Sequence, residues 1–226
     1  MTELAIYDMD RTITRTGTYT PFLLHAALRL KPWRLVLAPF VLLPMALYAA
    51  RAISRKRLKE VNQAMLLGAA VPRADLARVA ASFAEVVMKA NTLPGALKQI
   101  AEDRAAGRRL VLATASYRLY VAAIAERLGF DDVIATNSLT GVGDRIMARI
   151  DGENCYGPDK LRMIEAWMHD EKIDRAAIRI RFYSDHASDA PVLEWADEAF
   201  ATNPSAKLRT LAGRRGWPIL DWGVTV

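Results

Sequence analysis

The sequence predicts an α/β fold: a Rossmann-like parallel sheet with helices on both faces, and a helical cap domain inserted near the N-terminus. Two observations support this prediction. Apolar runs of strand length alternate with amphipathic stretches of helical period along most of the 226-residue chain. Residues 17–89 instead contain only helical patterns. We therefore expect residues 1–16 and 90–226 to form the core, and residues 17–89 to form the cap.

Five apolar runs account for the expected sheet. Apolar runs that alternate with helical patterns are typical of parallel strands, which are buried on both faces. The runs span residues 4–7, 110–113, 133–136, 178–183 and 199–202, and the helices between them span residues 94–106, 119–128 and 161–169. Glycines punctuate residues 137–152, which predicts a small hairpin at the rim of the sheet.

Four helices are expected in the cap. Proline and glycine interrupt helices, and Pro32, Gly68 and Pro72 mark the breaks in this region. The expected helices span residues 21–30, 33–50, 56–67 and 73–89. No strand is expected between residues 18 and 89.

Residues 35–50 form the most hydrophobic segment of the chain and carry no charge. A membrane-spanning helix needs about 20 apolar residues, whereas this segment is shorter and contains Pro39 and Pro44. We expect the segment to pack inside the cap or against a second subunit, which would make the protein a homodimer. Basic residues flank it on both sides, so peripheral contact of the cap with an anionic membrane stays open as an alternative.

Two carboxylates follow the first expected strand. Asp8 and Asp10 are separated by one residue at the end of the apolar run. Side chains at positions i and i+2 of a strand point to the same face, so both carboxylates can enter one cleft. This arrangement favours a phosphoryl-transfer site.

Three later features occur in the order and chain context that the same chemistry needs. They are the hydroxyl residues Thr114 and Ser116 after the second strand, Lys160 before a helix, and Asp185 and Asp189 after the fourth strand. In open parallel sheets the ligand lies at the carboxyl ends of the strands, where these side chains are expected to meet. Together they supply phosphate donors, a fixed positive charge and metal ligands.

These four segments resemble motifs one to four of the haloacid dehalogenase-like (HAD) hydrolases, and specifically of the subfamily that includes the phosphoserine phosphatases. The resemblance implies that Asp8 is a nucleophile that forms an aspartyl-phosphate. A carboxylate attacks a phosphate dianion only if a cation offsets the charge, so Mg²⁺ is the expected cofactor. Its protein ligands would be the carboxylates of Asp8 and Asp185 and the main-chain carbonyl of Asp10.

The resemblance also assigns roles to neighbouring residues. The Asp10 side chain would act as general acid toward the leaving oxygen and then as general base toward water. Thr114 would donate a hydrogen bond to a phosphoryl oxygen, and Lys160 would stabilise the charge of the transition state. Asp189 would support the site by orienting Lys160 or the metal ligands.

Four further residues are expected to bind substrate. Arg11 and Thr12 follow Asp10 in the loop after the first strand. Ala115 and Ser116 are expected at the start of the next helix. Main-chain N–H groups at a helix start lack partners within the helix and are natural phosphate donors.

We therefore expect a Mg²⁺-dependent phosphomonoester hydrolase that acts on a small phosphorylated metabolite or a lipid headgroup. Phosphoserine is a poor candidate. The phosphoserine phosphatases place a carboxylate shortly after motif one, and residues 13–20 contain none. Two alternatives remain open: a phosphotransferase of the same superfamily, and a non-catalytic membrane-docking or regulatory module.

Composition limits the partners. The formal net charge is +6, but no nucleic-acid-binding motif occurs and aromatic residues do not interleave with the basic clusters, so nucleic acid is not an expected partner.

The cysteine content and the N-terminus bear on the cell compartment. The single cysteine, Cys155, fits a reducing compartment. Asp8 and Asp10 interrupt the only N-terminal apolar stretch, which argues against a signal peptide. We expect a cytoplasmic protein, with membrane association through the cap as the alternative.

Overall fold

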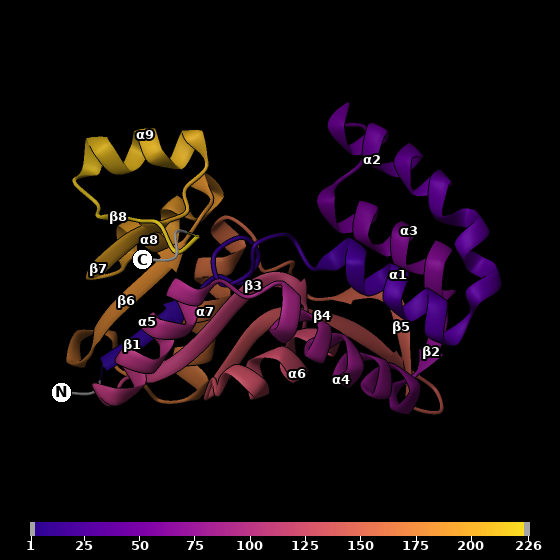
Figure 1. The fold of residues 1–226 in the computed structure, drawn as a ribbon, viewed down its shortest axis with the longest axis horizontal. Helices are drawn as coiled ribbons and strands as arrows, with labels where there is room; N and C mark the ends of the chain where they lie inside the picture. The colour runs from indigo at the N-terminus through magenta and orange to yellow at the C-terminus, as the bar shows by residue number, and fades with distance from the viewer. Residues whose placement is uncertain (1–2, 224–226) are drawn as a thin grey trace.

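The structure, a computed structural model, describes residues 3–223. An eight-stranded sheet crosses the molecule in the order β2-β5-β4-β3-β1-β6-β7-β8, in which the six strands from β4 to β8 are parallel and β5 and β2 are antiparallel (Figure 1). The strands are β1 (Glu3–Tyr7), β2 (Ala70–Pro72), β3 (Arg109–Tyr117), β4 (Asp132–Gly141), β5 (Arg145–Asp151), β6 (Arg179–Ser184), β7 (Glu198–Thr202) and β8 (Ile219–Leu220). The predicted α/β class with a largely parallel sheet is confirmed.

All five predicted strands are present, and three more complete the sheet. The predicted hairpin is confirmed, because β4 continues past residue 136 and pairs with the antiparallel strand β5. The prediction that the cap region contains no strand is wrong, because β2 pairs with β5. β2 has three residues and β8 has two, which is too short for either to show a strand period in the sequence.

The sheet is buried on both faces, as expected for parallel strands between two helix layers. In β1, Ala5 and Tyr7 belong to one hydrophobic cluster, whereas Leu4 and Ile6 belong to the other. This alternation follows from the two-residue repeat of a strand. The first cluster includes residues of α5 (Pro94–Ala105) and α6 (Arg118–Leu128), and the second includes residues of α7 (Pro158–Asp170), α8 (Ala190–Trp195) and α9 (Ala206–Arg215). The short 3₁₀ helices η2 (Arg175–Ala177) and η3 (Ala187–Asp189) flank β6.

The cap region is helical, with one correction to the predicted elements. It comprises α1 (Tyr19–Leu30), the 3₁₀ helix η1 (Pro32–Val41), α2 (Leu42–Ala49), α3 (Arg55–Leu67) and α4 (Arg73–Ala90). The single helix predicted over residues 33–50 is therefore wrong. Its first part is a 3₁₀ helix that contains Pro39, and only its second part is an α-helix. A proline ring clashes with the carbonyl group four residues earlier and lacks an N–H donor, so it disfavours a continuous α-helix here.

Two cap helices share a hydrophobic core with the sheet domain. The ring of Phe22 on α1 stacks on Tyr120 of α6, with centroids 4.3 Å apart, and Phe83 of α4 packs edge-on against both. Such aromatic pairs contribute about 0.5–1.5 kcal/mol each beyond the apolar area they bury. The cap is thereby fixed against α6, and one continuous cluster extends from β1 to α1 and α4.

Most of residues 35–50 do not pack inside the cap, which leaves contact with a second subunit as the part of that expectation that stays a prediction. Val36, Leu42 and Leu43 are 69%, 67% and 64% exposed. η1 packs against α1 and α3, and α2 packs against α3, so only one face of the segment is in contact with the cap. Within residues 3–223 no element covers its outer face, because α2 lies at the outer edge of the cap (Figure 1).

Candidate active site

The loop after β1 is a tight, hydrogen-bonded turn. Asp8 continues the sheet, because its N–H group donates to the carbonyl of Tyr183 at 2.9 Å. The Met9 carbonyl then accepts hydrogen bonds from three successive N–H groups, those of residues 12, 13 and 14. Arg11 has φ 65°, a left-handed conformation that is strained for a residue with a side chain. The turn carries the chain past the carboxyl end of the sheet and leaves the Asp8 and Asp10 side chains in a cavity.

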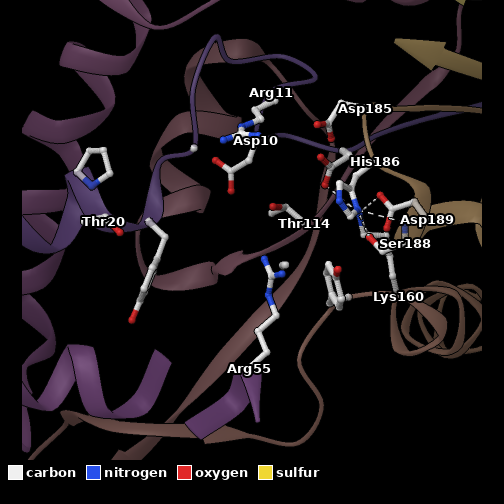
Figure 2. Close-up of a pocket in the computed structure, with 16 residues that line it drawn as sticks. Asp10, Arg11, Thr20, Arg55, Thr114, Lys160, Asp185, His186, Ser188 and Asp189 are labelled. Atoms are coloured by element: carbon white, nitrogen blue, oxygen red, sulfur yellow. Dashed lines mark hydrogen bonds and ion pairs between the residues drawn. The ribbon is translucent and has the colours of Figure 1, made fainter. Parts of the chain in front are cut away.

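This cavity has a volume of about 490 Å³ and lies between the carboxyl ends of the strands and the cap. Figure 2 shows side chains from both parts of the molecule around it. The core contributes Asp8, Asp10, Arg11, Thr114, Ala115, Tyr156, Lys160, Asp185, His186, Ser188 and Asp189, and the cap region contributes Gly17, Tyr19, Thr20, Pro21 and Arg55. Eight of the ten residues predicted for the site line it. Thr12 and Ser116 lie behind it, where each contacts a carboxylate that does line it.

Lys160 joins two of the carboxylates. It lies in the first turn of α7, and its Nζ donates to Asp8 Oδ1 at 2.8 Å and to Asp189 Oδ2 at 2.6 Å. The same Asp189 oxygen accepts from the Ser184 hydroxyl at 2.8 Å. Lys160 is only 2% exposed, so its charge requires these partners. The interaction predicted between Asp189 and Lys160 is thus present in the structure.

The ionisation of these groups reflects burial among like charges. Burial alone would lower the pKa of Lys160, but Asp189 and Asp8 more than offset it and raise that pKa above its ordinary value. Burial raises the pKa of Asp8 to about 6, against the opposing effect of Lys160. Burial, and then the charges of Asp8 and Asp189, raise the pKa of Asp185 to about 8. The site therefore contains more carboxyl groups than its one buried lysine can balance when they are ionised.

This excess of carboxylate oxygen is the chemistry that a hard divalent cation prefers. Asp8 and Asp185 line the same cavity and repel each other, and no protein hydrogen bond to the Asp185 carboxylate occurs among residues 3–223. No group of three or more His, Cys, Asp or Glu side chains placed to hold a metal occurs in the described chain. The predicted ligand set differs from such a group, because it consists of two carboxylates and the Asp10 carbonyl. The residues present are compatible with Mg²⁺ in their chemical type.

Asp10 is held by donors that the sequence analysis did not identify. Its Oδ1 accepts from the N–H and the hydroxyl of Thr18, both at 2.7 Å, and its Oδ2 accepts from the Ser116 hydroxyl at 2.7 Å. The Thr18 hydroxyl also lies 3.0 Å from the Tyr120 hydroxyl. Thr18 directly precedes α1, and no role was predicted for it from the sequence. The contact with Asp10 depends on the path of the loop and gives no sequence signal.

The strand that carries Thr114 is longer than predicted. β3 continues to Tyr117, with a register shift against β4 between Thr114 and Tyr117, and α6 begins only at Arg118. The expectation that Ala115 and Ser116 open a helix is therefore wrong. The Ser116 N–H group donates to Thr114 Oγ1 at 3.1 Å. The Ala115 carbonyl accepts from Thr136 Oγ1 and from Lys59.

Lys59 is a buried cation that the sequence analysis also missed. It extends from cap helix α3 to the core, where its Nζ donates to the Ala115 carbonyl at 2.6 Å and to Asn154 Oδ1 at 2.8 Å. The Tyr117 ring lies 4.4 Å from the ammonium group. Burial, and then the charge of Arg55, lower the pKa of Lys59 to about 7. A lysine within a strongly basic helix segment has no sequence feature that distinguishes it from exposed lysines.

Arg55 provides the cap's charge at the cavity. It is the first residue of α3, and its side chain lies at the cavity (Figure 2). Its guanidinium carbon lies 4.0 Å from the centroid of the Tyr156 ring. Arg11 and His186 line other parts of the same cavity. No carboxylate is present among the cap residues that line it, which agrees with the absence of acidic residues from positions 13–20.

Comparison with known proteins adds three findings. The family model described as haloacid dehalogenase-like hydrolase matches residues 5–194. The protein CicA of Caulobacter vibrioides is 31% identical over 197 residues, which cover 86% of this chain and 83% of CicA. Phosphoserine phosphatase SerB1 of Mycobacterium tuberculosis is 34% identical over 121 residues, which cover 53% of this chain and 38% of SerB1.

A solved structure of a Bordetella pertussis protein of unknown function resembles nearly the whole molecule. It has a TM-score of 0.86 and 25% identity, and the match covers 98% of this chain and 100% of that one. The first curated relatives are longer, and this chain spans 43% or less of their length.

Proposed function

The chain belongs to the haloacid dehalogenase-like hydrolases, and from this membership we propose that it is a Mg²⁺-dependent phosphomonoester hydrolase. The observation that supports this most directly is the meeting of Asp8, Lys160 and Asp185 in one cavity. They come from the end of β1, the start of α7 and the end of β6, far apart in sequence. The name of SerB1 supports the phosphatase class.

Asp8 is the proposed nucleophile. Its carboxylate is oriented at one oxygen by Lys160 and approached at the other by the Thr12 hydroxyl at 3.4 Å. One carboxylate oxygen forms a bond to phosphorus while the bond from phosphorus to the leaving oxygen breaks, which gives an aspartyl-phosphate. Water then attacks that phosphorus, releases inorganic phosphate and restores the carboxylate.

Positive charge makes the attack on a dianion feasible. Bound Mg²⁺ would offset the charge of the phosphoryl oxygens, and its protein ligands would be Asp8, Asp185 and the Asp10 carbonyl. Lys160 contributes a second, fixed positive charge, since Asp8 and Asp189 keep it protonated. Asp189 and Ser184 hold this ammonium group in position.

Asp10 is the proposed acid and base. As the first bond breaks, its protonated carboxyl gives a proton to the leaving oxygen, and the resulting carboxylate later takes one from the attacking water. Thr18 and Ser116 fix its orientation. Because Thr18 lies at the start of the cap region and Ser116 lies on β3, the carboxyl is positioned by both parts of the molecule. Thr114 lines the cavity, where we assign its hydroxyl to a phosphoryl oxygen.

The substrate is a small phosphorylated metabolite or the headgroup of a lipid. The cavity volume of about 490 Å³ accommodates a molecule of this size. Arg55 and Arg11 face it, and the cap contributes no carboxylate that would bind an ammonium group. We therefore favour a leaving group that is neutral or anionic over the zwitterionic leaving group of phosphoserine.

The test is hydrolysis of p-nitrophenyl phosphate by the wild type and Asp8→Asn, each with Mg²⁺ and with a chelator. We expect turnover only in the wild type with Mg²⁺, and a loss of at least about 10³-fold in Asp8→Asn. Asp144→Asn, which changes an exposed carboxylate that pairs with Arg73, is the matched control and should retain activity. Turnover that survives Asp8→Asn would refute the mechanism. Adding an alcohol acceptor separates hydrolysis from phosphoryl transfer.

A further inference from the structure

The outer face of the cap exposes an apolar surface that the proposed reaction does not use. It is formed by η1 and α2, residues Pro32–Ala49, which we call the apolar segment. Its exposed large apolar side chains are Trp33, Val36, Phe40, Leu42, Leu43, Met45 and Leu47, with exposed fractions from 41% to 69%. Apolar side chains gathered in this way mark an interaction site, because single exposed ones are otherwise scattered.

The shape of the segment fits a position in the plane of a membrane surface. Its inner side is anchored to the cap, where Val41 and Pro44 are buried and the two helices pack on α1 and α3. Although it is long and apolar enough to be a candidate span, it changes from a 3₁₀ helix to an α-helix at residue 42. A segment packed along one side and apolar on the other lies at the interface rather than across the bilayer.

The charges around the segment match an anionic surface. No Asp or Glu occurs between Asp10 and Glu60, a stretch that contains ten Lys and Arg residues. Residues 17–89 contain eleven basic and three acidic residues, so the insertion accounts for the whole net charge of +6. The exposed side chains of Arg29, Arg51 and Arg57 flank the apolar segment. A juxtamembrane basic residue contributes about 1 kcal/mol of attraction to an anionic leaflet.

Not all of the flanking basic residues are free to do this. Lys31 Nζ donates to the Leu67 carbonyl at 3.0 Å, and Arg34 donates to the Met65 carbonyl at 2.8 Å. These two side chains satisfy main-chain carbonyls at the C-terminal end of α3 and hold the segment on the cap. The basic residues that flank the apolar segment therefore form two groups. Some attach the segment to the cap, and the others remain on the surface.

A membrane explains the surface better than a second copy of this chain. Two identical caps meeting through this face would place their basic residues against one another, with Glu60, which pairs with Arg57 at 3.8 Å, as the one neighbouring carboxylate between residues 11 and 74. Trp33 and Tyr48 lie near the two ends of the segment, and these two residue types are enriched at the level of lipid headgroups. We propose that the apolar segment docks the protein on an anionic membrane surface, with its outer face among the headgroups.

The test is sedimentation with vesicles of phosphatidylcholine alone and of phosphatidylcholine mixed with phosphatidylglycerol. We compare the wild type with Phe40→Ser/Leu43→Ser, which removes two side chains that are 60% and 64% exposed. The control is Val142→Ser/Ile219→Ser, which changes exposed apolar residues of the β4–β5 turn and β8. We expect the wild type and the control to bind the anionic vesicles, and the first variant to bind at least about tenfold more weakly.

Three results would overturn the proposal. The wild type could stay in the supernatant with both vesicle types. It could bind both equally, which would remove the role of charge. Sedimentation velocity could show a dimer that Phe40→Ser/Leu43→Ser converts to a monomer, in which case a second copy covers the face. None of these results depends on catalysis, and p-nitrophenyl phosphate turnover of the same samples reports separately on the proposed reaction.

Discussion

At the scale of single residues, the site combines groups that would destabilise the protein if each were buried alone. Asp8, Asp185 and Asp189 are each less than 8% exposed, and Lys160 is 2% exposed. Isolated buried charges cost several kcal/mol, so the lysine offsets only part of the repulsion among three carboxylates. The remaining repulsion is a reason for the protein to bind a cation at this place.

Asp185→Asn tests that reasoning. In a chelator the variant should be more stable than the wild type by about 1 kcal/mol, because one of the mutually repelling carboxylates is gone. With Mg²⁺ the order should reverse, since a ligand that binds the folded state at 100 times its dissociation constant adds about 2.7 kcal/mol. Thermal unfolding with and without Mg²⁺ measures both effects. Equal stabilisation of the two proteins by Mg²⁺ would exclude Asp185 as a ligand.

Arg55→Ala tests the preference for the leaving group. If Arg55 binds an anionic group, KM for phosphoglycolate should rise by about tenfold or more, because a hydrogen bond to a charged group contributes about 1.5–3 kcal/mol. KM for p-nitrophenyl phosphate should change little. Arg57→Ala is the matched control on the same helix, since that side chain is 65% exposed and its ion pair with Glu60 spans 3.8 Å. A similar rise in KM for both substrates would contradict the assignment.

At the scale of secondary-structure elements, Lys59 connects α3 of the cap with the end of β3. Burial, and then the charge of Arg55, lower its pKa to about 7 against the opposing charges of Asp10 and Cys155. The unfolded chain therefore binds a proton that the folded protein lacks between about pH 7 and about pH 10. The contribution of Lys59 to the free energy of unfolding therefore increases with pH between about pH 7 and about pH 10.

The comparison with Lys59→Met isolates this effect. The free energy of unfolding of the wild type, relative to the variant, should increase by about 1 kcal/mol per pH unit over the window. Urea unfolding at a series of pH values measures it. If the difference between the two proteins is independent of pH, Lys59 is protonated in the folded state and the lowered pKa is wrong.

At Gly95, close packing against Trp222 favours glycine although alanine has the higher helix propensity. Gly95 lies near the start of α5, and a Cβ atom there would be 2.8 Å from the main chain and side chain of Trp222. Gly95→Ala should destabilise the protein by about 1–3 kcal/mol through overpacking. Gly213→Ala in α9, where no atom lies within 4 Å, should stabilise it by about 0.5–1 kcal/mol. Thermal unfolding measures both changes in stability. Equal changes in Gly95→Ala and Gly213→Ala would contradict the close packing of Gly95 on Trp222.

The elements also show what the sequence predicts well. Strands β1, β3 and β6 carry the motif residues and were predicted because apolar runs of strand length depend on local composition. The extension of β3 was missed because it depends on the pairing of Tyr117 with Thr136 of β4, beyond a register shift at Ala115 and Ser116. Lys59 and Arg55 were missed because their partners lie far away in sequence, and Thr18 was missed because its contact with Asp10 depends on the path of the loop.

At the scale of the whole molecule, charge and apolar surface are both concentrated in the inserted region. The core, outside residues 17–89, contains slightly more acidic than basic residues, whereas the insertion is strongly basic. Composition identifies residues 35–50 as apolar, but it does not reveal how many layers of structure surround the segment, so packing inside the cap and packing against a second subunit could not be distinguished from the sequence. The exposed face results from the position of α2 at the outer edge of the cap, where it packs against α3 and η1 (Figure 1).

The central step of the proposed reaction is the formation of a covalent phosphoryl group on Asp8. Asp10→Asn tests it with p-nitrophenyl phosphate, whose good leaving group needs little help from an acid, so the first step should proceed while hydrolysis of the aspartyl-phosphate stalls. Acid quenching followed by mass spectrometry should then show one phosphoryl group on the peptide that contains Asp8, and none in Asp8→Asn/Asp10→Asn. Nitrophenol release by Asp10→Asn without such a phosphoryl group, or with the group on another residue, would contradict the account.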